Sequence, residues 1–112
     1  MIYKVIFHIN EQEKWPTLLA NLTNLIKDLG ETKLECFIIA NGKAVLNYYN
    51  DQTLLLGIKE LQSNHINFMA CRNSLRGLNL NPDELSTMIK VIPAGVSELV
   101  IKQQAGFAYI KP

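Results

Sequence analysis

Short apolar runs that alternate with segments of helical spacing constrain the fold more than any other feature of this chain. The runs at residues 2–9, 34–40 and 66–70 are rich in β-branched and aromatic residues, which favour strands. The first run is almost continuously apolar, as in a parallel strand that is buried on both faces. Between residues 16 and 30, leucine and isoleucine recur at the spacing of one helix face, bounded by a proline and a glycine.

The remainder of the chain continues this alternation. Further helices are predicted at residues 44–48, 54–62 and 95–104, with shorter ones beginning at 72 and 81, and further strands at 90–93 and 106–110. Alternating strands and helices are typical of parallel sheets with right-handed crossovers. We therefore predict an α/β protein, a three-layer α/β/α sandwich with a mainly parallel five-stranded sheet, in which residues 1–112 form a single domain.

Composition narrows the classes of function. A net charge of +1 and a hydrophobic content of 48% are typical of a compact globular protein and speak against a nucleic-acid-binding or membrane-associated protein. No apolar run is long enough to span a membrane and no secretory signal is visible, so we expect a cytoplasmic protein. In that reducing compartment its two cysteines predict no disulfide. Their spacing predicts no metal site, and the chain has no cofactor-binding glycine-rich loop.

Cys71 is the candidate nucleophile. It lies between the strand predicted at 66–70 and a helix predicted to begin at Arg72. The free N–H groups of a helix start favour an anion, and Arg72 and Arg76 add positive charge nearby. Such surroundings lower the pKa of a thiol and make it reactive. The alternative is a small apolar side chain packed under the helix. Cys36, in the middle of an apolar run, is predicted to be an inert core residue.

Topology brings other residues to the same edge of the predicted sheet. Ligands bind outside the carboxyl ends of the strands in such sheets. There His8 is a candidate base or a histidine hydrogen-bonded at a strand end. The remaining candidates are either binding groups or ordinary turn, cap and surface residues: Asn41, Gly42, Arg72, Asn73, Ser74 and Gly95.

The motif Ala-Cys-x-Asn-Ser-Leu-Arg at residues 70–76 follows a strand, and the chain opens on Lys4–Ile9 and ends on Gly106–Pro112. With the Asn41-Gly42 break, these features resemble the DsrE/DsrF-like family of small sulfur-metabolism proteins. The resemblance implies a three-layer fold and homo-oligomers, often trimers or hexamers. It also implies that a single cysteine, here Cys71, carries sulfur as a persulfide and passes it to a partner, with donor and acceptor supplied by other proteins.

Three hypotheses of function follow. The first is a sulfur carrier, at most a sulfurtransferase-like enzyme, in which Cys71 accepts a sulfane sulfur. The second is a non-catalytic oligomeric module that binds a small ligand or anion at the same edge. The third is a structural or regulatory subunit in which Cys71 is merely packed. The sequence favours the first and names neither donor, acceptor nor pathway.

Overall fold

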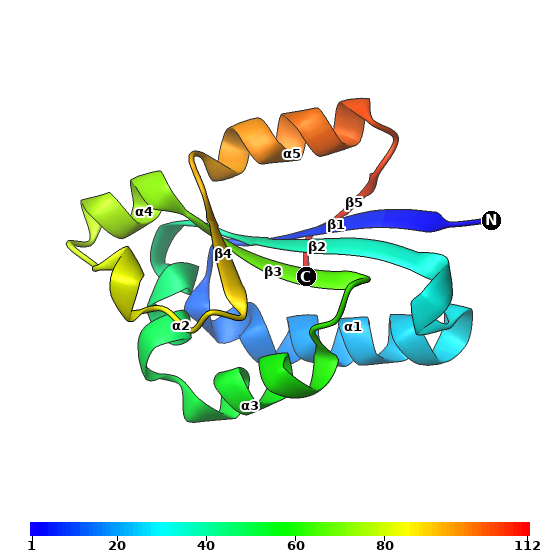
Figure 1. Ribbon diagram of the computed structural model, residues 1–112, viewed down its shortest axis with the longest axis horizontal. Helices are drawn as coiled ribbons and strands as arrows, with labels where there is room; N and C mark the ends of the chain where they lie inside the picture. The colour runs from blue at the N-terminus through cyan, green and yellow to red at the C-terminus, as the bar shows by residue number, and fades with distance from the viewer.

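The five strands form one all-parallel sheet. The computed structural model describes residues 1–112, and the sheet has the order β4-β3-β2-β1-β5 (Figure 1). Its members are β1 (Tyr3–Ile9), β2 (Leu34–Ala40), β3 (Ile66–Cys71), β4 (Ile89–Ile92) and β5 (Ala108–Ile110). The predicted α/β architecture is therefore confirmed, and the carboxyl ends of all strands meet at one edge.

Helices cover the sheet unequally. The helices α1 (Trp15–Leu29), α2 (Asn47–Asn50) and α3 (Gln52–Leu61) lie on one face, and α5 (Gly95–Gln104) alone lies on the other (Figure 1). The short helix α4 (Arg72–Gly77) extends β3 beyond the carboxyl edge. Single 3₁₀ turns connect these elements: η1 (Gln12–Lys14), η2 (Glu31–Lys33), η3 (Gly42–Leu46) and η4 (Pro82–Glu84). None of the helices has the length and apolar character needed to cross a membrane.

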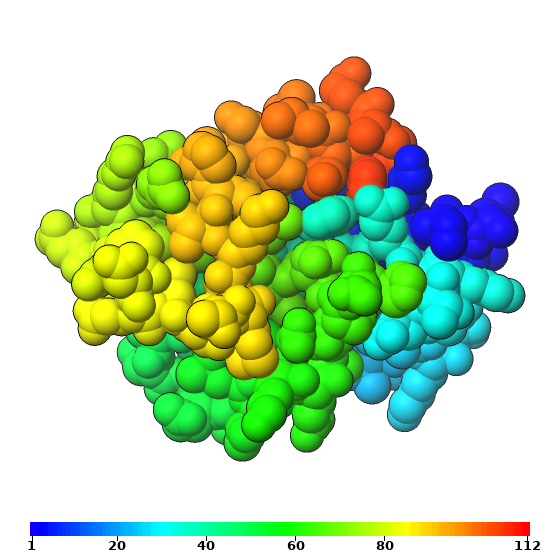
Figure 2. Space-filling model, in the orientation of Figure 1, coloured from blue at the N-terminus to red at the C-terminus, as the bar shows by residue number.

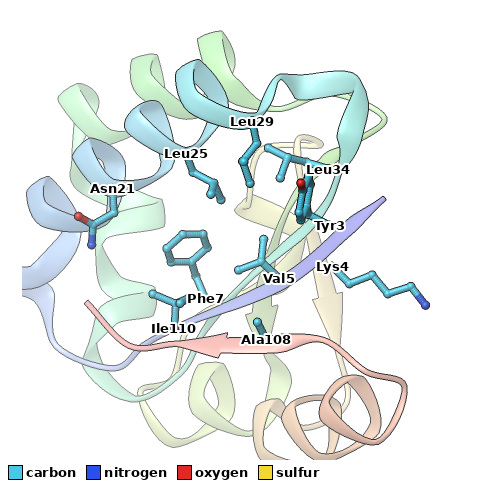
Figure 3. A pocket seen from close by; sticks show the side chains of 10 residues that line it. All are labelled: Tyr3, Lys4, Val5, Phe7, Asn21, Leu25, Leu29, Leu34, Ala108 and Ile110. Carbon is cyan, nitrogen blue, oxygen red and sulfur yellow. The ribbon is translucent and has the colours of Figure 1, made fainter. Parts of the chain in front are cut away.

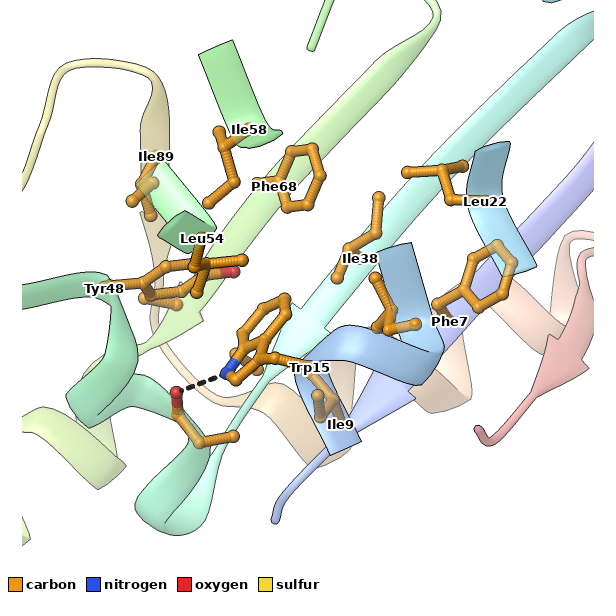
Figure 4. Close-up of a cluster of buried hydrophobic side chains, with 14 of the residues drawn as sticks. Phe7, Ile9, Trp15, Leu22, Ile38, Tyr48, Leu54, Ile58, Phe68 and Ile89 are labelled. Atoms are coloured by element: carbon orange, nitrogen blue, oxygen red, sulfur yellow. Dashed lines mark hydrogen bonds between the residues drawn. The ribbon is translucent and has the colours of Figure 1, made fainter. Parts of the chain in front are cut away.

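The larger core lies between the sheet and helices α1 to α3. It contains 20 buried residues, and Trp15 and Tyr48 are its largest members (Figure 4). Their rings pack with centroids 5.3 Å apart. Trp15 Nε1 donates to the Ala44 carbonyl at 3.0 Å, and the Tyr48 hydroxyl donates to the Met69 carbonyl at 3.0 Å. Both aromatic residues are therefore packing residues whose polar atoms have partners.

The α5 face has a smaller core of six buried residues. Lys102 extends over the ring of Phe37, with its Nζ 4.0 Å from the centroid, and is also paired with Glu98 at 3.5 Å. The outer side of α5 exposes Val96, Val100 and Ile101. In the space-filling view α5 forms a ridge along one side of the molecule, with the N-terminal residues beside its far end (Figure 2). This face is thus more open than the other.

Several boundaries differ from the sequence prediction; the segment 44–48, for example, forms part of η3 and the start of α2. Two further differences lie in β5 and β3. The predicted strand at 106–110 begins only at Ala108, because residues 106 and 107 close helix α5. The N–H of Gly106, at φ +93°, donates to Gln103, and the N–H of Phe107 donates to Lys102. At the other boundary, β3 includes Cys71 instead of ending before it. The cysteine therefore has strand geometry and a position in the β3–β4 ladder, opposite Ile92.

Candidate functional site

Cys71 lies at the carboxyl edge of the sheet, on the face covered by α5. It is the last residue of β3 and the N-cap of α4, with extended dihedral angles of −74° and 118°. Only 5% of its surface is exposed, whereas the two residues that follow, Arg72 and Asn73, are exposed. The thiol therefore lies just beneath the surface, within the first turn of the helix.

Two opposing effects act on the Cys71 thiol. Burial, the larger single effect, raises its pKa, but hydrogen bonding to the thiolate outweighs burial and the pKa is lowered. The donors, in decreasing order of effect, are the Ser74 hydroxyl and the backbone N–H groups of Gly95, Ser74 and Asn73. The Cys71 side chain makes no cap hydrogen bond with α4 in the structure. These donors consequently favour the charged sulfur over the neutral one, as a reactive cysteine requires.

The Ser74 hydroxyl is itself held by the loop that follows β2. The N–H of Gly42 donates to Ser74 Oγ at 2.8 Å. Gly42 has φ +55°, in the left-handed region that favours glycine, and it begins the turn η3. Residues 32 positions apart in the chain are thereby joined beside Cys71.

Gly95 brings helix α5 close to the cysteine. A Cβ placed on Gly95 would lie 3.4 Å from the Cβ atoms of Cys71 and Asn41 and 3.3 Å from Ile39 Cγ2. These distances are at the short limit of van der Waals contact, so the packing favours a residue without a side chain. Without a side chain at Gly95, helix α5 begins directly beside Cys71, and the Gly95 N–H is among the groups that lower the pKa of the thiol.

A chain of polar side chains lines the same edge. His8 Nε2 lies 3.0 Å from Asn41 Oδ1, and His8 Nδ1 lies 2.6 Å from the Tyr109 hydroxyl. Because an amide oxygen only accepts, Nε2 carries the proton, and in the neutral ring Nδ1 accepts from the tyrosine. His8 is therefore oriented on both sides, and its hydrogen bond to Asn41 links it to the residue packed beside Gly95.

Most residues proposed from the sequence gather around the cysteine, and the arginines do not take part as expected. His8, Asn41, Gly42, Asn73, Ser74 and Gly95 form the hydrogen bonds and packing contacts described above. Arg72 and Arg76 are exposed, and the pKa of Cys71 is lowered by hydrogen bonds rather than by their charge. The expected N–H groups of the helix start, those of Asn73 and Ser74, are among the groups that lower the pKa of Cys71, and the exposed arginines fit the alternative that treats them as surface residues.

Sequence reasoning did not find Tyr109. It lies in the last strand, at the opposite end of the chain from His8. Only the sheet order, which pairs β5 with β1, brings the two residues together. The signal that was present, an aromatic residue in a closing strand, does not indicate which strand is its neighbour.

Comparisons with known proteins identify the family and support the fold of this chain. The model of the DsrE/DsrF-like family matches residues 18–112. The chain belongs to the DsrE/DsrF-like family. A solved protein of unknown function from Methanobacterium thermoautotrophicum is similar over 98% of this chain and 99% of its own, at 30% identity and a TM-score of 0.88.

A second solved structure supports the fold alone. This conserved protein of unknown function from Bacteroides thetaiotaomicron is 20% identical, with a TM-score of 0.77, over 97% of this chain and 94% of its own. No curated protein matches the chain significantly. The DsrE/DsrF-like family is associated with sulfur relay in general, and that association is the functional information the comparisons add.

The apolar groove of this family member is remote from Cys71. It has a volume of about 350 Å³ and lies on the opposite face, between α1 and the β1–β5 edge (Figure 3). Eight of its ten lining residues are hydrophobic, among them Val5, Phe7, Leu25 and Ile110. The apolar groove and the cysteine edge are thus on opposite faces of the sheet.

Proposed function

We propose that this protein is a sulfur carrier in which Cys71 accepts a sulfane sulfur as a persulfide and passes it to a partner protein. The observation that carries the proposal is the position of Cys71 at the end of β3, where α4 begins and Gly95 of α5 packs beside it; the neighbouring N–H and hydroxyl groups lower its pKa despite its burial. Membership of a family associated with sulfur relay supports the same chemistry. In this role the protein is at most a sulfurtransferase-like enzyme and needs no cofactor.

The chemistry requires only the thiolate and an external donor. With an inorganic polysulfide, Sγ of Cys71 attacks a sulfane sulfur and forms a new S–S bond, and the donor S–S bond breaks. The electron pair leaves with the shortened polysulfide dianion, so no separate oxidant or reductant is consumed. The product persulfide carries a negative charge on its outer sulfur, which suits a site that already favours an anion.

Neighbouring residues have supporting roles in this proposal. The backbone N–H groups of Asn73, Ser74 and Gly95 stabilise the thiolate. His8 and Asn41 shape the edge over which a donor or acceptor approaches. We further propose that the protein acts as a cytoplasmic homo-oligomer, a trimer or hexamer, that exchanges sulfur with separate donor and acceptor proteins.

The deciding experiment is mass mapping of the reduced protein after incubation with polysulfide. We expect one added sulfur on the peptide containing Cys71, its loss in Cys71→Ser, and its retention in Cys36→Ser. An unmodified Cys71, or sulfur found on Cys36 alone, would contradict the carrier function.

The same variants separate the carrier from the non-catalytic alternative. A module that only binds a small anion at this edge retains its backbone N–H groups in Cys71→Ser. It would therefore keep any thermal stabilisation by that anion after the thiol is removed. A carrier loses covalent sulfur uptake in the same variant, whether or not an anion stabilises it.

A further inference from the structure

The hydrogen bond between Gly42 and Ser74 restricts how the Ser74 hydroxyl can be used. A serine hydroxyl has one proton to donate and two lone pairs that accept. The Gly42 N–H, at 2.8 Å, occupies one lone pair. The hydroxyl proton then points away from Gly42, and Cys71 lies three residues earlier, at the N-cap of the same helix.

We infer that Gly42 positions the Ser74 hydroxyl as a hydrogen-bond donor to Cys71 Sγ, and that this donor controls both the loading and the delivery of sulfur. The inference rests on the proposed carrier function and adds a residue role to it. Among the groups that lower the pKa of Cys71, the Ser74 hydroxyl has the largest effect, which supports the geometry.

The two half-reactions respond differently to this donor. In loading, Sγ is the nucleophile, and a hydrogen bond raises its thiolate fraction but reduces the reactivity of each thiolate. In delivery, an acceptor attacks the outer sulfur, the Sγ–S bond breaks, and the electron pair returns to Sγ. Sγ is then the leaving group, and a more stable thiolate leaves faster. The hydroxyl therefore assists delivery at every pH and assists loading only where the thiol is protonated.

Ser74→Ala gives this inference a signature that simple structural damage does not produce. If the variant raises the pKa of Cys71 by about one unit, loading from polysulfide becomes roughly threefold slower at low pH. It becomes roughly threefold faster above the pKa, because intrinsic nucleophilicity rises with pKa. Delivery to cyanide, which forms thiocyanate and restores the Cys71 thiolate, becomes severalfold slower throughout. Ser74→Thr keeps a hydroxyl and should restore wild-type behaviour, and Ser97→Ala, at an exposed serine of α5, is the matched control.

The positioning role of Gly42 is tested by making Gly42→Ala both in the wild-type protein and in the Ser74→Ala variant. Gly42→Ala places a Cβ 3.4 Å from the Asn10 carbonyl oxygen at a positive φ, which displaces the loop. It should raise the midpoint pH of Cys71 alkylation in the wild-type background and have no further effect in Ser74→Ala. Equal, additive shifts in both backgrounds would overturn the positioning role of Gly42.

The experiment separates failure of this inference from failure of the carrier function. A wild-type protein that loads sulfur, beside a Ser74→Ala variant with unchanged alkylation, loading and delivery profiles, leaves the carrier standing and overturns the role of Ser74. Uniform slowing of loading and delivery at every pH would also overturn it, since that indicates general damage. A wild-type Cys71 that takes up no sulfur overturns the carrier function and, with it, the control of loading and delivery. In that case the alkylation profile of Ser74→Ala still decides whether the hydroxyl acts on the thiolate.

Discussion

The two cysteines of this chain are both buried, yet their environments have opposite effects on the thiol. Cys36 is 0% exposed and Cys71 is 5% exposed. Burial raises the pKa of Cys36 to about 12, whereas hydrogen bonds lower the pKa of Cys71 against the effect of its burial. The degree of burial alone therefore does not determine the direction in which the pKa of a thiol is shifted.

The difference lies in the backbone around each sulfur. Cys36 lies within β2, paired with Val5 on one side and Ile66 on the other, and its own N–H donates to the His65 carbonyl at 2.8 Å. In the interior of a sheet such N–H groups are used by the ladder. Cys71 lies where a strand ends and two helices begin, and the first N–H groups of a helix have no partner within it. Free donors thus occur at element ends, and a thiol placed there is stabilised as an anion.

The largest effect expected from this difference is in thiol reactivity. At neutral pH, iodoacetamide should modify Cys71 of the native protein at least about 30-fold faster than Cys36, because much less of Cys36 is thiolate and the higher nucleophilicity of its thiolate offsets only part of that difference. In concentrated urea the two rates should become similar, since both environments are then lost. Peptide mapping at several times measures both rates in one sample. A large ratio that persists in urea would mean that local sequence, not tertiary structure, sets the difference.

The two thiols should also make the free energy of unfolding depend on pH in opposite directions. The folded pKa of Cys36 is raised, so its neutral thiol contributes fully below the unfolded pKa of about 8.5, and this contribution is lost as the pH rises toward 12. The folded pKa of Cys71 is lowered, so its contribution is present above the unfolded pKa and is lost as the pH falls through the folded pKa.

Urea denaturation between about pH 6 and pH 10 measures both contributions. In the wild type, ionisation of Cys36 should lower the free energy of unfolding by up to about 1.4 kcal/mol per pH unit above about pH 9. In Cys36→Ala this decrease should be absent. In the wild type, the free energy of unfolding should rise with pH between the folded pKa of Cys71 and about pH 9. In Cys71→Ser this increase should be absent. Identical pH profiles in the wild type and both variants would contradict these opposite shifts.

Replacing each cysteine by serine should show the same difference in the free energy of unfolding at constant pH. Cys36→Ser places a hydroxyl in the apolar interior, at an expected cost of about 1–3 kcal/mol in the free energy of unfolding. Cys71→Ser places it among backbone donors at the edge, and the cost should stay below about 1 kcal/mol. Cys36→Ala measures the effect of the lost packing alone, because alanine removes the sulfur without adding a hydroxyl. Equal destabilisation by the two serine variants would mean that the backbone N–H groups around Cys71 do not donate hydrogen bonds to the hydroxyl that Cys71→Ser introduces.

The smallest expected effect comes from Gly95→Ala. The new Cβ would press on Cys71, Asn41 and Ile39 and move the Gly95 N–H away from the sulfur. The midpoint pH of Cys71 alkylation should rise by about half a unit. Gly77→Ala is the matched control, because a Cβ there has no heavy atom within 4 Å. A midpoint that moves equally in both variants would show that the close approach of α5 is not responsible.

Much of the fold was predictable because the signals are local. Period and composition identified β1, β2 and β3. The short helix predicted to begin at 81 is the turn η4, where Asn81 Oδ1 accepts from the Asp83 N–H at 3.0 Å. The error at residues 106 and 107 arose because apolar residues after a glycine suit a strand and a helix cap equally well. Which one forms depends on where α5 ends.

The candidate site was predictable only in outline. The rule that parallel strands end together placed His8, Asn41, Ser74 and Gly95 near Cys71. The hydrogen bonds from Gly42 to Ser74 and from His8 to Tyr109 join positions 32 and 101 residues apart, and no local pattern encodes them.

The sequence by itself determined the alternation of strands and helices, the family resemblance and the position of Cys71 at a strand end, because these follow from neighbouring residues. Tertiary structure alone decided which donors surround the sulfur. Helix α5, the loop at Gly42 and helix α4 converge there because the sheet aligns the ends of β2, β3 and β4. A thiol pKa depends on the few groups in contact with the sulfur. The chemistry of Cys71 is therefore a property of the assembled edge and not of the segment that contains it.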